Sequence, residues 1–141
     1  MTQYVEIGSN KMTKIVLVDD DAFVLRVHAE MLKAMGYVPF TFESPEDALK
    51  YLRGYREHVS MVITDYRMPQ MNGLEFIGRF RHFDSHTPVT ILTAFASEVD
   101  KKMAENCNVK VIHKPIRMHV LGEHVQSSLS KMKQLTSTCL S

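Results

Sequence analysis

Five short runs of apolar and β-branched residues recur along the chain, and each ends at polar or turn-forming residues. Runs of roughly four to eight such residues are typical of strands that are buried in a parallel sheet. We therefore predict five strands, at residues 15–18, 37–42, 61–64, 88–93 and 109–112. Pro39 has no backbone N–H to donate, so the second strand fits best at an edge of the sheet.

Between these runs, apolar residues return at i, i+3 and i+4 spacing, which is the period of an amphipathic helix. The pattern predicts five helices, at residues 21–35, 44–54, 73–83, 97–107 and 115–133. Ser44 and Ser97 are the expected N-caps of the second and fourth helices, and Gly36 is the expected stop of the first. In the first helix we expect His28 to be a partly buried core residue and Leu25, which falls off the apolar stripe, to be exposed.

A chain that alternates strands with helices forms a parallel sheet with helices on both faces, because right-handed crossovers leave few other arrangements. The expected fold class is a doubly wound α/β domain. With 141 residues and 45% apolar composition, the chain suffices for one such domain and its core. We assign residues 14–133 to this domain, residues 1–13 to a loosely held N-terminal arm and residues 134–141 to a polar tail.

The chain has 17 basic and 16 acidic residues and a net charge of +1. This balance excludes a general electrostatic attraction to nucleic acids or membranes. Cys107 and Cys139 are too few for a disulfide framework. No apolar stretch approaches the roughly 18 to 20 residues of a membrane span, and the polar N-terminus lacks the apolar segment of a secretory signal. We therefore expect a cytoplasmic protein without direct contacts to nucleic acid or membrane.

Side chains that can take part in chemistry stand at the ends of the predicted strands. Asp19 and Asp20 follow the first strand, Asp65 follows the third, Thr93 ends the fourth and Lys114 follows the fifth. The carboxyl ends of parallel strands meet at one edge of a sheet. Clustered carboxylates repel one another and need raised pKa values or a bound cation, and oxygen ligands suit Mg²⁺. Together these side chains predict a pocket that holds a phosphoryl group on a carboxylate.

Four short motifs occur in a fixed order around these residues. They are Val-Asp-Asp-Asp at 18–21, Asp-Tyr-Arg-Met-Pro with Met-Asn-Gly-Leu at 65–74, Leu-Thr-Ala at 92–94 and His-Lys-Pro at 113–115. On these motifs the chain resembles the receiver domains of two-component response regulators, over about residues 14–133. The resemblance implies a flavodoxin-like sheet of strand order 2-1-3-4-5. It also implies a phosphoacceptor that assists its own phosphorylation and dephosphorylation without being a turnover enzyme.

The resemblance assigns a role around the phosphoryl group to each matching residue. Asp65 would accept the group from a sensor histidine kinase or a histidine phosphotransfer protein. Lys114 would neutralise one phosphate oxygen, and Thr93 would bond another. Ala94 is small enough to leave room for the group, and the peptide bond before Pro115 is expected to be cis.

The same resemblance implies a metal site for Mg²⁺ or Mn²⁺. Asp20, Asp65 and the main-chain carbonyl of Arg67 would bind the ion directly, and Asp19 would act through water. Val111 stands where many relatives carry Tyr or Phe, so the usual aromatic switch is absent or altered. Arg67 and Phe95 are bulky enough to shield the phosphoryl group from water, which predicts slow autodephosphorylation.

Partner surfaces follow from the resemblance and from exposed apolar residues. The fourth helix, fifth strand and fifth helix would form the output face and a possible homodimer contact, and an exposed Leu25 could belong to a kinase-docking surface. A chain of this length would be either a single-domain regulator or a receiver cut from a larger protein.

Three other interpretations stay open. Asp19-x-Asp21 after a strand also resembles haloacid-dehalogenase-like phosphatases, in which Asp19 would be the nucleophile, although Phe23 stands where Thr or Val is usual. The receiver fold could also be an interaction module that is never phosphorylated. Finally, His82 and His86 have the i, i+4 spacing of metal ligands but no evident third ligand.

Overall fold

A computed structural model of the chain describes the backbone of residues 13–140 and the side chains of residues 13–131. The N-terminal arm predicted at residues 1–13 lies almost entirely outside these described residues. Five strands form one parallel sheet in the order β2-β1-β3-β4-β5. The strands are β1 (Lys14–Val18), β2 (Val38–Phe42), β3 (Met61–Thr64), β4 (Val89–Thr93) and β5 (Val109–His113). All five predicted strands and their order are therefore confirmed.

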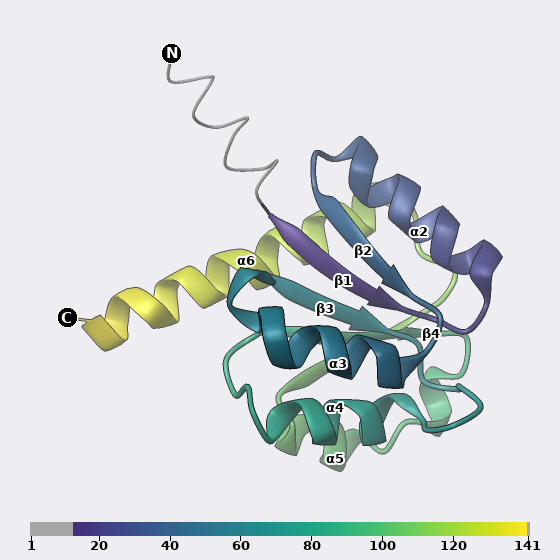
Figure 1. Cartoon of the computed structure of the whole chain (residues 1–141). Coiled ribbons are helices and arrows are strands. Elements are labelled where there is room, and N and C mark those ends of the chain that lie inside the picture. Colours follow the sequence, from purple (N-terminus) through teal and green to yellow (C-terminus); the bar gives the residue numbers. More distant parts are fainter. Residues whose placement is uncertain (1–12, 141) are drawn as a thin grey trace.

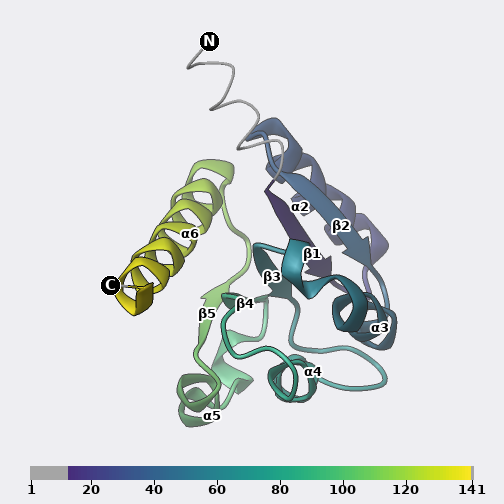
Figure 2. The ribbon, with the colours of Figure 1, turned by 60° about the vertical axis from the view of Figure 1, so that its left-hand side comes forward.

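Helices cover both faces of this sheet (Figures 1 and 2). They are α2 (Ala22–Ala34), α3 (Pro45–Tyr55), α4 (Gly73–Arg81), α5 (Lys101–Asn106) and α6 (Met118–Leu140), with the 3₁₀ turns η1 (Arg56–His58) and η2 (Ala96–Glu98). α2 and α6 lie on one face, and α3, α4 and α5 lie on the other. None of the helices in the described part of the chain has the length and apolarity to span a membrane.

Strand β1 contributes side chains to two apolar clusters, one on each face of the sheet. Successive side chains of a strand point to opposite faces. Ile15 and Leu17 accordingly join the apolar cluster beneath α2 and α6, whereas Val16 and Val18 join the cluster beneath α3, α4 and α5. All four are at most 2% exposed, as expected for a strand at the centre of a sheet that is covered on both faces.

Local signals of the sequence explain several element ends. The Ser44 hydroxyl accepts a hydrogen bond from the Asp47 N–H at 3.3 Å and caps α3, whose first residue is Pro45. Gly36 follows α2 with φ of 91°, a conformation that glycine adopts without steric cost. Strand β2, which contains Pro39, lies at the sheet edge as predicted.

The prediction for the fourth helix was wrong at its start. Ser97 lies within the 3₁₀ turn η2, where no side chain caps the N-terminus. α5 begins four residues later and is capped by Asp100, whose carboxylate accepts a hydrogen bond from the Met103 N–H at 3.1 Å. Val99, between them, is buried and has an extended backbone. Its extended conformation ends the 3₁₀ turn η2 before α5 begins.

The prediction that Leu25 is exposed was also wrong. Leu25 is 6% exposed and packs in the core, and the predicted burial of His28 is confirmed. Phe23 and Val27 are the exposed apolar residues of this helix. Two series with helical spacing coexist in α2, and the series that contains Leu25, His28, Ala29 and Leu32 is the buried one.

Helix α6 begins later and ends later than predicted. Residues 115–117 precede it, and the buried Ile116 anchors this connection in the core. Helix α6 then continues to Leu140 instead of ending near residue 133. Residues 134–140 are Gln-Leu-Thr-Ser-Thr-Cys-Leu and lack Gly and Pro, so their polarity does not prevent a helix.

Gly73 joins the start of α4 to the loop after β3 more closely than any other residue type would allow. Its N–H donates to the Tyr66 carbonyl at 2.7 Å. A Cβ at this position would lie 2.6 Å from the carbonyl oxygen of Asp65, which is far inside van der Waals contact. The loop that carries Asp65 is thus held against the N-terminus of α4.

We predict that Gly73→Ala lowers the free energy of unfolding by about 1–3 kcal/mol, because the loop or the helix must move. Gly78→Ala is the matched control in the same helix. A Cβ there meets no atom within 4 Å, so this change should stabilise the protein by roughly 0.5–1 kcal/mol. Urea unfolding of both variants checks the prediction, and equal stabilities would contradict it.

Candidate functional site

The carboxyl ends of the strands bring the predicted site residues to one edge of the sheet (Figure 1). Main-chain hydrogen bonds continue the pairing just past the strands. The Asp65 N–H donates to the Val18 carbonyl at 2.9 Å, and the Lys114 N–H donates to the Thr93 carbonyl at 2.8 Å. The backbone next to each functional side chain is therefore fixed by the sheet itself.

Lys114 forms ion pairs with two carboxylates at once. Its Nζ lies 2.8 Å from Oδ2 of Asp19 and 3.4 Å from Oδ2 of Asp65. All three side chains are at most 15% exposed. Water screens this charge cluster only weakly, so the ammonium group is the main compensation for the two adjacent acids.

Asp19 is the most enclosed of the acids, with 4% of its surface exposed. Burial raises the pKa of its carboxyl group above the ordinary value. Hydrogen bonds from Lys114 and from the Asp21 N–H oppose this rise, and the negative charge of Asp65 adds to it. The folded protein therefore disfavours the ionised form of Asp19 unless a cation compensates it.

Asp19, Asp20 and Asp65 form an oxygen cluster whose ligand atoms lie within 4.8 Å of one another. Within the part of the chain whose side chains are described, no other group of three or more such ligands occurs. Asp20 is exposed and leaves one side of the cluster open to solvent. Carboxylate oxygens with room for water fit Mg²⁺, which keeps several waters and accepts few protein ligands.

Short hydrogen bonds hold Asp65 and its backbone. Oδ1 of Asp65 accepts a hydrogen bond from the Tyr66 N–H at 2.7 Å. The Thr64 hydroxyl donates to the Asp65 carbonyl at 2.9 Å. With Oδ2 near Lys114, both carboxylate oxygens of Asp65 have one partner within the protein and capacity for more.

Thr93 is fully buried at the end of β4, and its Oγ accepts a hydrogen bond from the Phe95 N–H at 3.1 Å. The hydroxyl hydrogen is not used in this bond and is available to another acceptor. Ala94 is exposed beside it. The Lys114–Pro115 peptide bond is cis, and Val111 packs half-buried against the apolar cluster on the face covered by α5.

Glu98 is a site residue that sequence reasoning missed. The Arg67 guanidinium donates two hydrogen bonds to its carboxylate, one of 2.8 Å from Nε and a shorter one from Nη2. The same guanidinium lies 3.8 Å from the centroid of the Phe95 ring. The pKa of Arg67 is raised, chiefly by the hydrogen bonds to Glu98. No local pattern could have paired residues 31 positions apart in sequence.

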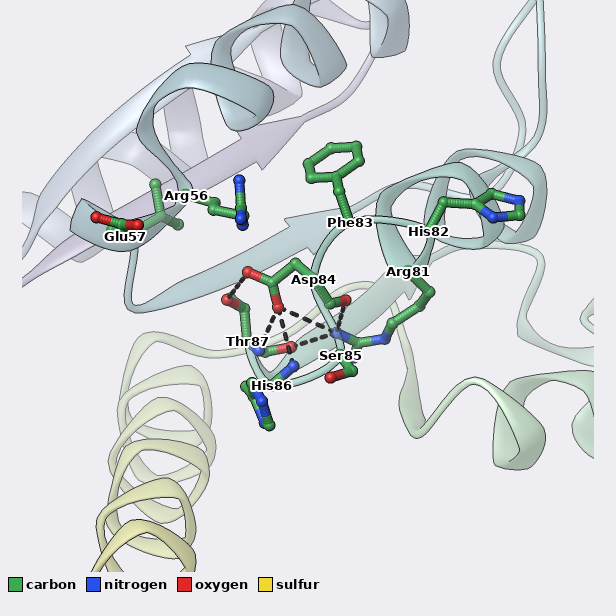
Figure 3. A pocket seen from close by; sticks show the side chains of 10 residues that line it. Arg56, Glu57, Arg81, His82, Phe83, Asp84, Ser85, His86 and Thr87 are labelled. Atoms are coloured by element: carbon green, nitrogen blue, oxygen red, sulfur yellow. Dashed lines mark hydrogen bonds and ion pairs between the residues drawn. The ribbon is translucent and has the colours of Figure 1, made fainter.

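A second hollow lies at the opposite ends of the strands, between η1 and the loop that precedes β4 (Figure 3). Its volume is about 570 Å³. Arg81 lines it and donates hydrogen bonds to the carbonyls of Thr87 and Cys107 at 2.8 and 3.0 Å. Burial lowers the pKa of the Arg81 guanidinium. The carboxylate of Asp84 accepts two N–H groups and the Thr87 hydroxyl.

His82 and His86 both line this hollow and are exposed. They do not belong to any group of three or more metal ligands among the described residues. The hydrogen bonds of Arg81 tie the end of α4 to the loop before β4 and to the C-terminus of α5, so the polar side chains here have a structural role.

Comparisons with known proteins agree with this geometry. Residues 15–126 match the family model described as the response regulator receiver domain. The transcriptional regulatory protein GlrR of Escherichia coli is 32% identical over 129 residues, which is 91% of this chain and 29% of GlrR. The chain therefore spans less than a third of the length of that relative.

Solved structures show the same fold. A response regulator receiver domain protein from Clostridium thermocellum superposes with a TM-score of 0.81 at 22% identity, covering 87% of this chain and 98% of that one. The response regulator protein TrrA of Thermotoga maritima gives a TM-score of 0.74 at 28% identity, covering 84% of this chain and all of TrrA. Together with the family match over most of the sequence, these likenesses show that the chain belongs to the response regulator receiver domain family.

Proposed function

We propose that this receiver domain accepts a phosphoryl group on Asp65 in a Mg²⁺-dependent reaction and passes the signal on by a change of conformation. The observation that carries the proposal is the position of Lys114, which bridges Asp65 and Asp19 next to the open oxygen cluster. An oxygen of Asp65 therefore stands between a fixed positive charge and the ligands of a divalent cation.

The reaction that we propose is a displacement at phosphorus. An oxygen of Asp65 forms a bond to the phosphorus of a phosphohistidine, the P–N bond breaks, and the imidazole leaves and is protonated by solvent. Lys114 compensates charge on a phosphoryl oxygen, and the Thr93 hydroxyl hydrogen is free to bond another. Bound Mg²⁺ would supply further charge compensation, and positioning supplies most of the rate.

Names of relatives support this chemistry and the kind of partner. TrrA was crystallised in complex with Mg²⁺ and a beryllium fluoride. A sensor histidine kinase, RcsC of Escherichia coli, is 29% identical to this chain over 118 residues. We propose that a sensor histidine kinase or a histidine phosphotransfer protein is the phosphodonor here, and that the receiver is not a turnover enzyme. The predicted cytoplasmic location fits such a donor.

We assign the output to the face of α5, β5 and α6. Met103 on α5 and Met118 and Val120 on α6 expose 42–51% of their surfaces, so apolar atoms are available there for a partner or a second copy of the chain. A ligand-driven change from 1:99 to 99:1 between two states takes about 5.5 kcal/mol of differential stabilisation. New charged contacts at Lys114 and Thr93 would be its source.

The first test replaces the acceptor. Asp65→Asn should abolish incorporation of phosphate from a small acyl phosphate with Mg²⁺, measured by intact-protein mass spectrometry, and should leave the thermal unfolding cooperative. Wild-type protein that stays unmodified would favour a phosphorylation-independent interaction module. Label found on Asp19 by peptide mapping would favour the haloacid-dehalogenase-like mechanism instead.

The second test separates stability from metal binding. Asp19→Asn should raise the melting temperature of the Mg²⁺-free protein, because a neutral amide avoids the burial of a charge while Lys114 keeps Asp65 as a partner. Excess MgCl₂ should then stabilise the variant less than the wild type. Glu105→Gln, an exposed acid outside the cluster, is the control. A variant less stable than wild type without Mg²⁺ would contradict this account.

The third test concerns the lifetime of the phosphoryl group. Arg67, held by Glu98 and stacked on Phe95, would shield the group from water. Arg67→Ala should speed its loss several-fold, and Glu98→Gln should act in the same direction, measured as phosphate release from the Mg²⁺-loaded protein. Arg79→Ala, an exposed arginine on α4, is the control. A lifetime of seconds that Arg67→Ala leaves unchanged would refute the shielding role.

A further inference from the structure

A buried hydroxyl group stands directly before the proposed phosphoacceptor. Thr64 is the last residue of β3, and 1% of its surface is exposed. Its hydroxyl donates a hydrogen bond to the main-chain carbonyl of Asp65 at 2.9 Å. A carbonyl oxygen only accepts hydrogen bonds, so the threonine is the donor. The side chain before the acceptor is thus bonded to the backbone of the acceptor itself.

The Asp65 carbonyl and the Tyr66 N–H belong to one peptide group. The group is planar and trans, so its C=O and N–H point in opposite directions and turn together. The C=O end accepts the hydrogen bond from Thr64 at 2.9 Å, and the N–H end donates to Oδ1 of Asp65 at 2.7 Å. A rotation that takes the carbonyl away from the Thr64 hydroxyl therefore also takes the N–H away from the carboxylate.

The chain is held on both sides of this peptide group. Before it, the Asp65 N–H donates to the Val18 carbonyl of β1 at 2.9 Å. After it, the Tyr66 carbonyl accepts a hydrogen bond from the Gly73 N–H of α4 at 2.7 Å. Between these two main-chain bonds, the Thr64 hydroxyl bonds the peptide group itself.

We propose that Thr64 is a positioning residue of the phosphoacceptor site, because its hydroxyl orients the 65–66 peptide group and the N–H of that group holds Oδ1 of Asp65. The proposal rests on the function proposed above. A carboxylate held at Oδ1 turns less freely, so Oδ2 keeps its place 3.4 Å from Nζ of Lys114. The acceptor then meets the phosphorus in one orientation, and oriented reactants need less entropy loss at the transition state.

The simpler alternative is that Thr64 only packs at the end of a strand. β-Branched residues are common in strands, and a buried hydroxyl bonds whichever acceptor is near. Two substitutions separate these roles. Thr64→Val keeps the branched shape and removes the hydroxyl, whereas Thr64→Ser keeps the hydroxyl and leaves a hole the size of a methyl group. A packing role makes the serine variant the more defective one, and a positioning role makes the valine variant so.

The kinetic experiment measures the initial rate of phosphorylation by a small acyl phosphate with saturating Mg²⁺. Loss of the hydrogen bond should slow Thr64→Val roughly threefold to tenfold, while Thr64→Ser should stay within about twofold of wild type. This order should hold although Thr64→Ser has the lower melting temperature of the two. A rate for Thr64→Val within about twofold of wild type would overturn the proposal, as would a Thr64→Ser variant that is as slow as Thr64→Val.

Thr90→Val is the matched control. Thr90 is another buried threonine of the sheet, 2% exposed, and its hydroxyl is bonded to Nε2 of His124 on α6 at 2.6 Å. It lies in β4 three residues before Thr93, away from the strand ends that carry the acids. Loss of this hydroxyl should leave the phosphorylation rate unchanged. A rate reduced as much as in Thr64→Val would show that any lost buried hydroxyl has this effect, which refutes a specific role of Thr64.

Hydrogen exchange of single amides, followed by NMR, provides a readout that does not depend on phosphorylation. The Tyr66 N–H should exchange several-fold faster in Thr64→Val than in wild type and in Thr64→Ser. The Asp65 N–H, which is bonded to β1, should keep its protection in all three proteins. Unchanged exchange at Tyr66 in Thr64→Val would overturn the inference. A wild type that takes up no phosphate defeats the proposed function instead, and exchange at Tyr66 still decides whether Thr64 orients this peptide group.

Discussion

The structure of the site depends on one buried ammonium group between two carboxylates. Lys114 at the end of β5 reaches Asp19 and Asp65 at the ends of β1 and β3, so the ion pairs cross β4 and connect both halves of the sheet. Two acids at this depth would repel each other without it. The cost of burial nevertheless remains visible in the raised pKa of Asp19. Compensation by the lysine is therefore incomplete, and the open oxygen cluster is where we propose that a cation binds.

The order of the strands makes this arrangement possible. Because β1 pairs directly with β3, the acids that follow them become neighbours, and β4 and β5 then add a hydroxyl and an ammonium from the other side. The two faces of the sheet contribute differently. Gly73 lets the N-terminus of α4 press against the loop of Asp65 on one face, whereas on the other face α2 begins at its Asp21 cap, directly after Asp19 and Asp20. The sheet fixes the positions along the edge, and the close approach of α4 holds the loop that carries Asp65.

Sequence reasoning identified all five strands, the fold and the cluster of Asp19, Asp20 and Asp65, because buried strands have a short-range signal and their ends converge by topology. It failed where two local signals competed. Both Ser97 and Asp100 can cap a helix, and only tertiary packing of Val99 decides between them. Leu25 was misplaced because α2 carries two overlapping apolar series. Glu98 was missed because its partner Arg67 is distant in sequence, and such pairs leave no periodic signal.

One series of side-chain contacts connects Thr93, inside the site, to exposed residues at its rim. The resemblance predicts an altered switch at Val111, which has no ring where many relatives are expected to carry one. Here the Thr93 hydroxyl holds the Phe95 N–H, the Phe95 ring packs under the Arg67 guanidinium, and that guanidinium is bonded to Glu98. These contacts join the loop after β3 to the loop after β4 at the rim of the site. The side-chain contacts of Thr93 therefore lead to the rim formed by Arg67 and Glu98, while its main chain is paired with β5.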